Sequence, residues 1–317
     1  MRAYIVKRLL LIIPTVFLVS LIVFIVIRLI PGSIVDLMAQ QYQYMTNMDK
    51  QAIEKALGFS TPLFSQYLHW MNQILVHGNL GNSLWTNLPV IDEITARWPV
   101  TLELGIMAII TAQIIALPIG IYSAIRQDTV GDYVARSFGI LCIAIPGFWL
   151  ATLVIVFPSI WWHYTPSIRL IHFNVDPIGN IKMFIVPALI LGMELSGMTM
   201  RMTRTMMLEV LRQDYVRTAW AKGLRERTVI MRHALKNAFI PVITIIGWQL
   251  PLLIGGTVII ENIFQLPGMG QLIINATQQR DYTIVSSVLF LFAIAIMLIN
   301  LLVDISYAFL DPRVHYK

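Results

Sequence analysis

Six long apolar segments, separated by polar stretches, dominate the pattern of the chain. The first runs from Leu9 to Ile27 without a charged residue. Five more follow, at about residues 100–123, 137–162, 183–203, 239–261 and 284–309. About 20 apolar residues in a helix cross the hydrocarbon core of a bilayer. Proline interrupts several segments, which membrane helices tolerate because neighbouring groups satisfy the freed carbonyls. The pattern predicts an all-α, polytopic membrane protein with six transmembrane helices.

Residues 31–98 differ from the rest because they are polar enough to lie in water. Turn and capping residues predict short helices there, over Asp49–Leu57, from Thr61-Pro62 to Gly78, and from Pro89 to Trp98-Pro99. The second has an apolar face that is expected to pack on the membrane domain or lie in the interface. No small-residue cleavage pattern follows the first apolar segment, so we expect it to be retained. The expected domains are 1–30, the N-terminus and first span; 31–98, an outer loop; 99–309, a five-helix core; and 310–317, the C-terminus.

Basic residues are distributed unequally between the two sides of the membrane. With six spans both termini share one side, which then holds sixteen of the 23 Lys and Arg, nine of them within residues 201–236. Such an excess marks cytoplasmic loops. We therefore expect both termini and the loop 204–238 in the cytoplasm. The formal net charge of +6 has the same explanation, so no nucleic acid partner is expected.

Composition agrees with a bilayer protein, with 57% hydrophobic and 13% charged residues against about a quarter charged in soluble domains. The single cysteine, Cys142, excludes an intramolecular disulfide. A nucleotide-binding P-loop is absent, since residues 192–199 read GMELSGMT with methionine where lysine is required. Neither paired metal ligands nor a nucleophile with its base is found, and His163 and His172 are nine residues apart. We expect a chain that is not an enzyme and binds no cofactor or metal.

The most distinctive polar stretch is Asp214–Pro241, named here the elbow, between the fourth and fifth spans. Asp214 is a plausible helix N-cap and Gly223 suits the left-handed residue that ends a helix. A second helix is expected from near Arg225 toward Pro241. The elbow is too short to form a domain, so we expect another protein to bind it.

Ionisable residues within the spans are Glu103, Glu194 and Asp304. A carboxylate at the bilayer centre costs about 2.5–3.5 kcal/mol on insertion scales, so these side chains are expected to face the bundle interior or a cavity. For Glu194, in the middle of the fourth span, the readings are a solute path or a structural polar group with a partner. The methionines around it, beginning with Met193, are more consistent with adaptable packing than with metal binding.

Several stretches, in order along the whole chain, resemble the permease subunits of binding-protein-dependent ABC importers of the dipeptide, oligopeptide and nickel class. They are SQYLHWMNQIL with HGNLGNS (65–83), ARWPVTLEL (96–104), AIPGFWL (144–150), DYVRTAWAKGL (214–224), RHALKNAFIP (232–241), ENIFQLPGMG (261–270), RDYTIV (280–285) and NLLVDISYAFLDPR (300–313). The chain departs from the family pattern at Arg225, where a small hydroxyl residue is common, and at Trp220, where a basic residue is frequent. The second elbow helix is therefore expected to lack a side-chain cap.

The resemblance implies a type I importer fold in a bacterial or archaeal inner membrane. It also implies a second homologous permease subunit, two ABC ATPase subunits that bind ATP and Mg, an extracytoplasmic solute-binding protein and contact with membrane lipid. The elbow would dock in an ATPase cleft, through Asp214, Tyr215, Arg217, Ala219, Lys222, Gly223, Leu224, His233 and Asn237. Candidates for the pore or gate are Glu194, Met193, Gln249, Glu261, Phe264, Pro267 and Gly268.

By this resemblance the imported solute is a di- or oligopeptide, with nickel chelates and oligosaccharides as alternatives. An ion-coupled secondary transporter is a further alternative. It would show inverted repeats and broken central helices, and the six segments contain no convincing internal repeat.

Overall fold

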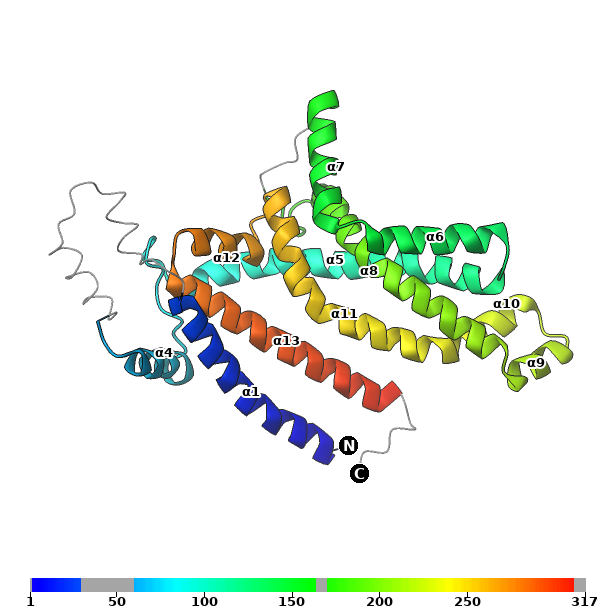
Figure 1. The fold of residues 1–317 in the computed structure, drawn as a ribbon, viewed down its shortest axis with the longest axis horizontal. Helices are drawn as coiled ribbons and strands as arrows, with labels where there is room; N and C mark the ends of the chain where they lie inside the picture. The colour runs from blue at the N-terminus through cyan, green and yellow to red at the C-terminus, as the bar shows by residue number, and fades with distance from the viewer. Residues whose placement is uncertain (1, 30–59, 164–169, 311–317) are drawn as a thin grey trace. The chain divides into compact units, whose positions relative to one another are not determined.

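The computed structural model describes residues 2–29, 60–163 and 170–310, and the predicted helix over Asp49–Leu57 lies outside these ranges. The described residues are almost entirely helical, with one isolated bridge between Asn82 and Pro89 (Figure 1). The helices are α1 (Arg2–Leu29), α4 (Leu63–His77), α5 (Val90–Ile125), α6 (Val130–Ala144), α7 (Gly147–Trp162), α8 (Pro177–Leu211), α9 (Asp214–Ala221), α10 (Glu226–Thr228), the π-helical turn η1 (Val229–Ala234), α11 (Leu235–Phe264), α12 (Met269–Gln278) and α13 (Tyr282–Leu310).

The chain divides into two compact units. The core unit is Val100–Pro267 with Leu298–Lys317, and the flanking unit is Arg2–Pro99 with Gly268–Met297. Helices α5 and α13 each contribute residues to both units.

Among the described residues, helices long and apolar enough to cross a membrane occur at five of the six predicted positions. These are single helices or continuous helical runs, in α1, α5, α8, Glu226–Phe264 and α13. The sixth position, predicted as one span over 137–162, is occupied by α6 and α7, which meet at an angle of 89°. The predicted single span is thus corrected to two helices. The break falls at Pro146, since a proline disfavours helical geometry in the residue before it, and Ile145 is extended at ψ 118°.

Pro99 does not interrupt the helix that contains it, although the sequence predicted that a short helix would end there. Instead α5 runs without interruption from Val90 to Ile125. A proline inside a helix removes one backbone donor and leaves one carbonyl to find another partner, which membrane helices tolerate. The predicted boundary between residues 98 and 99 therefore falls within a helix.

Within the core unit, α8 is the central helix and packs against both α6 and α11. Its buried residues Phe184, Ala188 and Ile190 form a hydrophobic cluster with Leu104 of α5 and Ile260 of α11. The close approach of α5 and α8 also depends on glycine. A Cβ atom added to Gly120 of α5 would lie 2.8 Å from the Met200 carbonyl oxygen of α8. Small residues at such contacts are typical of membrane helix packing.

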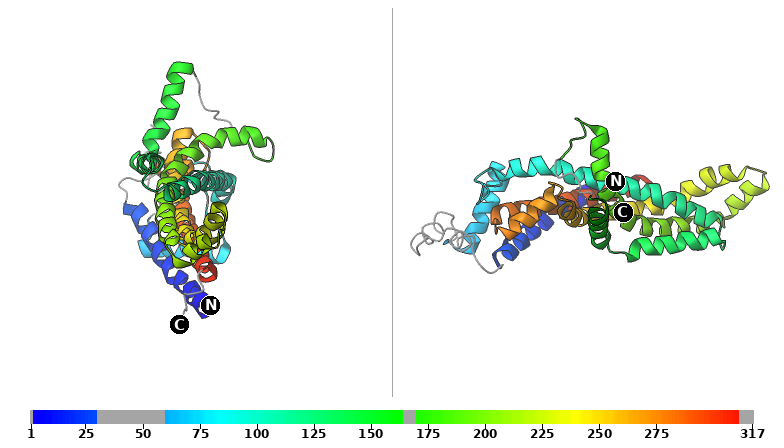
Figure 2. Two further views of the ribbon diagram at one scale, coloured as in Figure 1. Left: turned by 90° about the vertical axis from the view of Figure 1, so that its right-hand side faces the viewer. Right: turned by 90° about the horizontal axis from the view of Figure 1, so that it is seen from above.

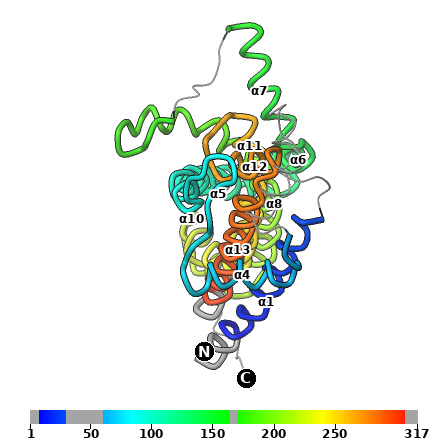
Figure 3. The backbone as a smooth tube through the Cα atoms, turned by 90° about the vertical axis from the view of Figure 1, so that its left-hand side faces the viewer, coloured from blue at the N-terminus to red at the C-terminus, as the bar shows by residue number. Residues whose placement is uncertain are grey.

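In the flanking unit, α4 packs against α1, as Figure 3 traces. Tyr67 is buried on Phe24, and its hydroxyl is 2.8 Å from the Ser20 hydroxyl. The predicted apolar face of α4 is thus partly correct, since Tyr67 and Met71 are buried while Phe64 is exposed. The helix begins at Leu63 with Pro62 at the N-cap position, one residue later than predicted, and it ends at Gly78 as expected.

Two of the motifs noted in the sequence meet in the flanking unit. The Asp281 carboxylate, fully buried, accepts hydrogen bonds from Ser83 Oγ at 2.6 Å and the Leu84 amide at 2.9 Å. Trp85 Nε1 donates to the Gln279 carbonyl oxygen at 2.8 Å. The loop after α4 is thereby fixed to the start of α13.

The glycine contact between α5 and α8 gives a test of the core packing. Gly120→Ala places a methyl group against Met200 and Thr203, and such overpacking costs about 1–3 kcal/mol. We expect a lower thermal unfolding temperature of the detergent-purified protein. The matched control is Gly255→Ala in α11, where an added Cβ has nothing within 4 Å. It should unfold at the wild-type temperature or above, and equal losses in both variants would contradict this account of the contact.

Candidate functional site

The elbow lies at one end of the core unit, where it joins α8 to α11 (Figure 2). Its first arm is α9, and its second arm is α10 followed by η1 and the start of α11. Asp214 was predicted as the N-cap of the first arm, but Gln213 holds that position without a side-chain bond. Asp214 is instead the first helical residue, where a negative charge still complements the helix dipole.

The turn between the arms has the geometry predicted for Gly223. Its φ is +73°, in the left-handed region. The Gly223 amide donates to the Trp220 carbonyl oxygen at 2.9 Å, and the Leu224 amide donates to that of Ala219 at 3.4 Å. This pair of bonds is the Schellman motif, which ends a helix and favours glycine because a Cβ atom is strained at positive φ.

The second arm is longer than predicted, because it does not end near Pro241. Helix begins at Glu226 and continues through η1 and Pro241 to Phe264. Arg225 precedes it and makes no side-chain capping bond, as the departure from the family pattern predicted. The elbow is therefore continuous with a membrane span.

The two arms pack on a small apolar core. Val216 and Ala219 of α9 are buried with Val229 of η1, against Val210 and Leu211 at the end of α8. Ala219 was expected to contact a partner, but only 5% of it is exposed, so it packs inside the elbow.

A hydrogen bond also joins the arms. Asn237 Nδ2 of α11 donates to the Tyr215 hydroxyl of α9 at 2.8 Å, and lies 3.4 Å from the His233 carbonyl oxygen. The structure thus brings together three of the predicted coupling residues, which are up to 22 positions apart in the sequence.

The outer surface of the elbow combines positive charge with apolar side chains. Between residues 212 and 237 there are seven Lys and Arg but only two acidic residues. Arg217 and Lys222 are exposed, and the Arg217–Asp214 ion pair is long, at 3.7 Å, and solvated. Also exposed are the large side chains of Tyr215, Trp220, Leu224 and Met231. Exposed apolar groups rimmed by charge are typical of protein interaction sites.

A buried ion pair near the elbow was not predicted from the sequence. Asp132 was not among the candidate residues, and Arg204 was placed in the loop 204–238. The fully buried Asp132 carboxylate accepts two bonds from Arg204 of α8, from Nε and from Nη2, each at 2.9 Å. Ser123 of α5 and the Asp128 amide also donate to it. Asp132 therefore ties α5, α6 and α8 together where α8 approaches the elbow.

A local signal for this site does exist in the sequence. Thr129 precedes Asp132 by three residues, which is the spacing of a capping box at a helix start. Thr129 is the N-cap of α6, and its hydroxyl accepts from the Asp132 amide at 3.4 Å. The partner Arg204, 72 residues away, has no such signal.

The pore and gate candidates lie in different environments. Gln249 is buried and donates to the Leu195 carbonyl and the Thr199 hydroxyl, both at 3.0 Å, so it joins α11 to α8. Glu261 is fully buried and accepts from Thr101 at 2.6 Å. Phe264 belongs to the hydrophobic cluster of the core unit.

Glu194 was expected in the bundle interior or a cavity, but within this chain it is exposed. It lies beside Gly147 at the break between α6 and α7, since a Cβ added to Gly147 would be 3.1 Å from its Oε2. Met193 is half-buried. Helix α11 ends at Phe264, three residues beyond the predicted span 239–261, and Pro267 and Gly268 lie in the short break before α12.

Known proteins of one family are similar over the whole chain. Residues 116–316 match the model of the binding-protein-dependent transport system inner membrane component, and residues 1–105 match that of the N-terminal part of such membrane components. The dipeptide transport system permease protein DppB of Escherichia coli K12 is 36% identical over 340 residues, covering all of both chains. The glutathione transport system permease protein GsiC of the same strain is 35% identical over 320 residues, again with full coverage.

Solved structures agree on the fold. A subunit of the inward-facing MetNI methionine ABC transporter has a TM-score of 0.56 at 16% identity, covering 68% of this chain and 95% of that one. An amino acid ABC transporter has a TM-score of 0.54 at 11% identity, covering 69% and 94%. At these identities the likeness establishes the fold alone, which is the predicted type I permease fold.

The Asp132 ion pair gives a test of what positions the elbow. Asp132→Ala leaves the Arg204 guanidinium buried without a carboxylate, and breaking a buried pair in this way costs about 3–5 kcal/mol. We expect a large fall in thermal stability and faster proteolysis of the elbow. Replacing Arg204 by Met in the same background should recover part of the loss.

The control for that test is Asp214→Ala, which removes the carboxylate of the solvated Arg217 pair on the same side of the molecule. It should lower the unfolding temperature far less than Asp132→Ala, because an exposed ion pair contributes only about 0–1 kcal/mol. If both aspartate variants behave alike, Asp132 has no special structural role.

Proposed function

The chain belongs to the inner-membrane components of binding-protein-dependent transport systems, and on that premise we propose that it is the pore-forming subunit of an ATP-driven peptide importer. Relatives of its full length are named as dipeptide, glutathione and peptide transport permeases. The substrate class we assign is di- or oligopeptides delivered by an extracytoplasmic solute-binding protein.

The observation that carries the proposal is the construction of the elbow. The two arms meet at the turn of Gly223, and Val216, Val229 and the Tyr215–Asn237 bond hold them together. The first arm follows α8 after a two-residue turn, and the second arm continues directly into α11. A rigid element joined to two membrane helices can transmit movement from a bound partner into the membrane. The basic outer surface would orient that partner electrostatically.

In this proposal the partners supply the chemistry that the chain lacks. Two ATPase subunits bind ATP and Mg, and each receives one permease elbow. A second, homologous permease subunit completes the pore. The excess of basic residues supports a cytoplasmic elbow with both termini on the same side.

The exposed Glu194 is assigned to the solute path between the two permease subunits. A carboxylate in mid-span that no group of its own chain buries is costly in lipid, so an aqueous or subunit-facing position is favoured. Gln249 and Glu261 are assigned to the support of α11, because both are buried between helices.

Transport by reconstituted protein tests the proposal. The subunit alone should show neither ATP hydrolysis nor uptake in liposomes. The complete complex with its binding protein should take up labelled peptide only when ATP is present on the elbow side. Uptake driven by an ion gradient without ATP would make the chain a secondary transporter, and uptake of nickel chelates or oligosaccharides in place of peptides would change the assigned substrate.

Gly223→Asp tests the elbow as the coupling element. A Cβ at Gly223 has nothing within 4 Å, so the variant should fold, at a backbone cost of about 1 kcal/mol for the left-handed conformation. Its carboxylate would project from a basic docking surface. Pairing with the second permease subunit should be normal, whereas ATPase co-purification and binding-protein-stimulated ATP turnover should fall sharply.

Two controls separate docking from backbone strain. Gly78→Asp makes the same change at φ +61° in open space at the end of α4, and should leave ATPase attachment intact. Asn237→Ala removes the bond to Tyr215, worth about 1 kcal/mol, together with the long contact to the His233 carbonyl oxygen, and should have a milder effect. Wild-type attachment and turnover in Gly223→Asp would show that coupling occurs elsewhere.

A further inference from the structure

An exposed face of α8 carries two opposite charges with a methionine between them. Glu194, Met198 and Arg201 follow one another at steps of four and three residues, so they are neighbours on one face of the helix. All three side chains are exposed within this chain, and together they are named here the charged stripe. In the part of the chain that the structure describes, no ion pair or hydrogen bond engages the side chain of Glu194 or Arg201.

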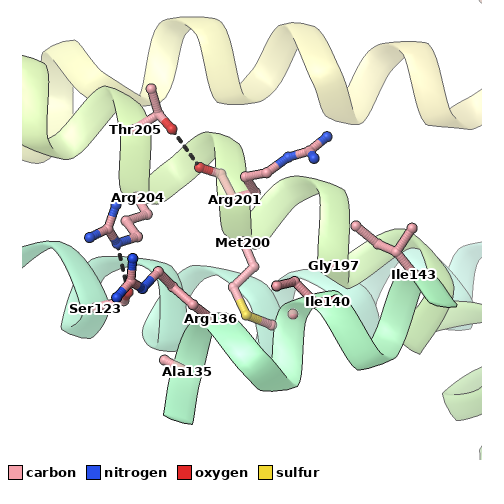
Figure 4. Close-up of a pocket in the computed structure, with 11 residues that line it drawn as sticks. Ser123, Ala135, Arg136, Ile140, Ile143, Gly197, Met200, Arg201, Arg204 and Thr205 are labelled. Atoms are coloured by element: carbon pink, nitrogen blue, oxygen red, sulfur yellow. Dashed lines mark hydrogen bonds between the residues drawn. The ribbon is translucent and has the colours of Figure 1, made fainter. Parts of the chain in front are cut away.

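Arg201 is separate from the other arginines of this part of the core unit. Figure 4 shows its side chain pointing away from Arg136 and Arg204. Those two arginines are engaged by the Asp132 carboxylate, at 3.6 Å and 2.9 Å respectively. Arg201 therefore remains available to a ligand on the exposed face of α8.

Both charges of the stripe lie within a membrane span. Helix α8 is long and apolar enough to cross the bilayer, and a charged side chain inside it is costly unless it faces water or a protein partner. The Glu194 carboxylate lies at the break between α6 and α7, where its Oε2 would be 3.1 Å from a Cβ atom on Gly147. The charged stripe is thus suited to an aqueous path and unsuited to lipid.

We propose that the charged stripe binds a peptide by its two charged ends as the peptide crosses the membrane, an inference that rests on the peptide import proposed above. Glu194 accepts hydrogen bonds from the α-ammonium group, and the planar guanidinium of Arg201 donates two parallel bonds to the α-carboxylate. The C-terminus of the peptide then lies toward the elbow, because α8 leads from Glu194 through Arg201 to the elbow.

The spacing of the two charges matches a short peptide. Glu194 and Arg201 are seven residues apart, which is about 10 Å along a helix axis. An extended peptide of about three residues spans the same distance. Met198 lies between the charges, and its flexible thioether can adapt to peptide side chains of different shapes. The charged stripe would therefore recognise the ends of a peptide and tolerate variation in its sequence.

The same pair of charges disfavours the other substrates considered. A neutral oligosaccharide would leave both Glu194 and Arg201 without a counter-charge. A simple anion would satisfy Arg201 alone. A peptide with free ends is a zwitterion, and it supplies one opposite charge to each side chain.

Equilibrium dialysis of labelled trialanine against the purified complex, without the binding protein and without ATP, tests the charged stripe. We expect saturable binding of trialanine and weaker binding of N-acetyl-trialanine and of trialanine amide. Arg201→Gln should weaken trialanine binding about tenfold, as expected for one hydrogen-bonded charge, and should leave binding of the amide unchanged. Glu194→Gln should likewise weaken trialanine binding and leave binding of the N-acetylated peptide unchanged.

The matched controls are Glu209→Gln and Arg212→Gln, which remove exposed charges from the end of the same helix, beyond the charged stripe. Both should bind the three peptides as the wild type does. Absence of saturable binding, or an equal effect of Arg201→Gln on trialanine and its amide, would overturn the proposal. Loss of the second permease subunit from either stripe variant, with peptide binding unchanged, would overturn it in favour of a subunit interface.

ATP-driven uptake by the reconstituted wild-type complex separates a failure of this inference from a failure of the proposed function. If the complex imports peptide but the two stripe variants bind all three peptides as the wild type does, only the assignment of the charged stripe is wrong. If the wild-type complex imports no peptide, the proposed function is wrong and the charged stripe has no peptide to bind.

Discussion

The Asp132 carboxylate is the interaction on which the elbow end of the core unit depends. Two opposite charges are buried together there, and only a close, fully hydrogen-bonded geometry offsets the loss of their hydration. Arg204 supplies two of those bonds, and Ser123 and the Asp128 amide supply the others. Since these groups come from α5, α6, α8 and the turn between α5 and α6, none of these elements can shift alone without exposing a buried charge.

Features set by local rules could be predicted from the sequence. Apolar segments of about 20 residues place the spans because lipid offers no partner for backbone groups. Gly223 was assigned a left-handed turn from its place between two helical stretches, and its φ of +73° confirms this. The missing cap at Arg225 was predicted because arginine stands where the family commonly has a small hydroxyl residue.

Features set by distant contacts could not be predicted. Nothing near Asp132 indicates that Arg204 is its partner, and nothing near Tyr215 indicates the bond from Asn237. The sequence also does not tell which prolines interrupt a helix. Pro146 lies at the break between α6 and α7, whereas Pro99 and Pro241 lie within continuous helix. Ala219 was placed on the docking surface for its motif, yet the packing of the arms buries it.

The π-helical turn η1 determines how the buried face of the second elbow arm lines up with the buried face of the span that follows it. Ile230, Ala234, Ala238 and Val242 are all buried, at steps of four residues. In an ordinary α-helix each step of four overshoots one turn by about 40°, so the first and last would face directions about 120° apart. A π-helical turn holds more residues than an α-helical turn, so it cancels most of this angular difference and keeps all four side chains on one face. The second arm and the first turns of α11 therefore share one buried face, and rotation of this stretch about its own axis would carry the second arm with it.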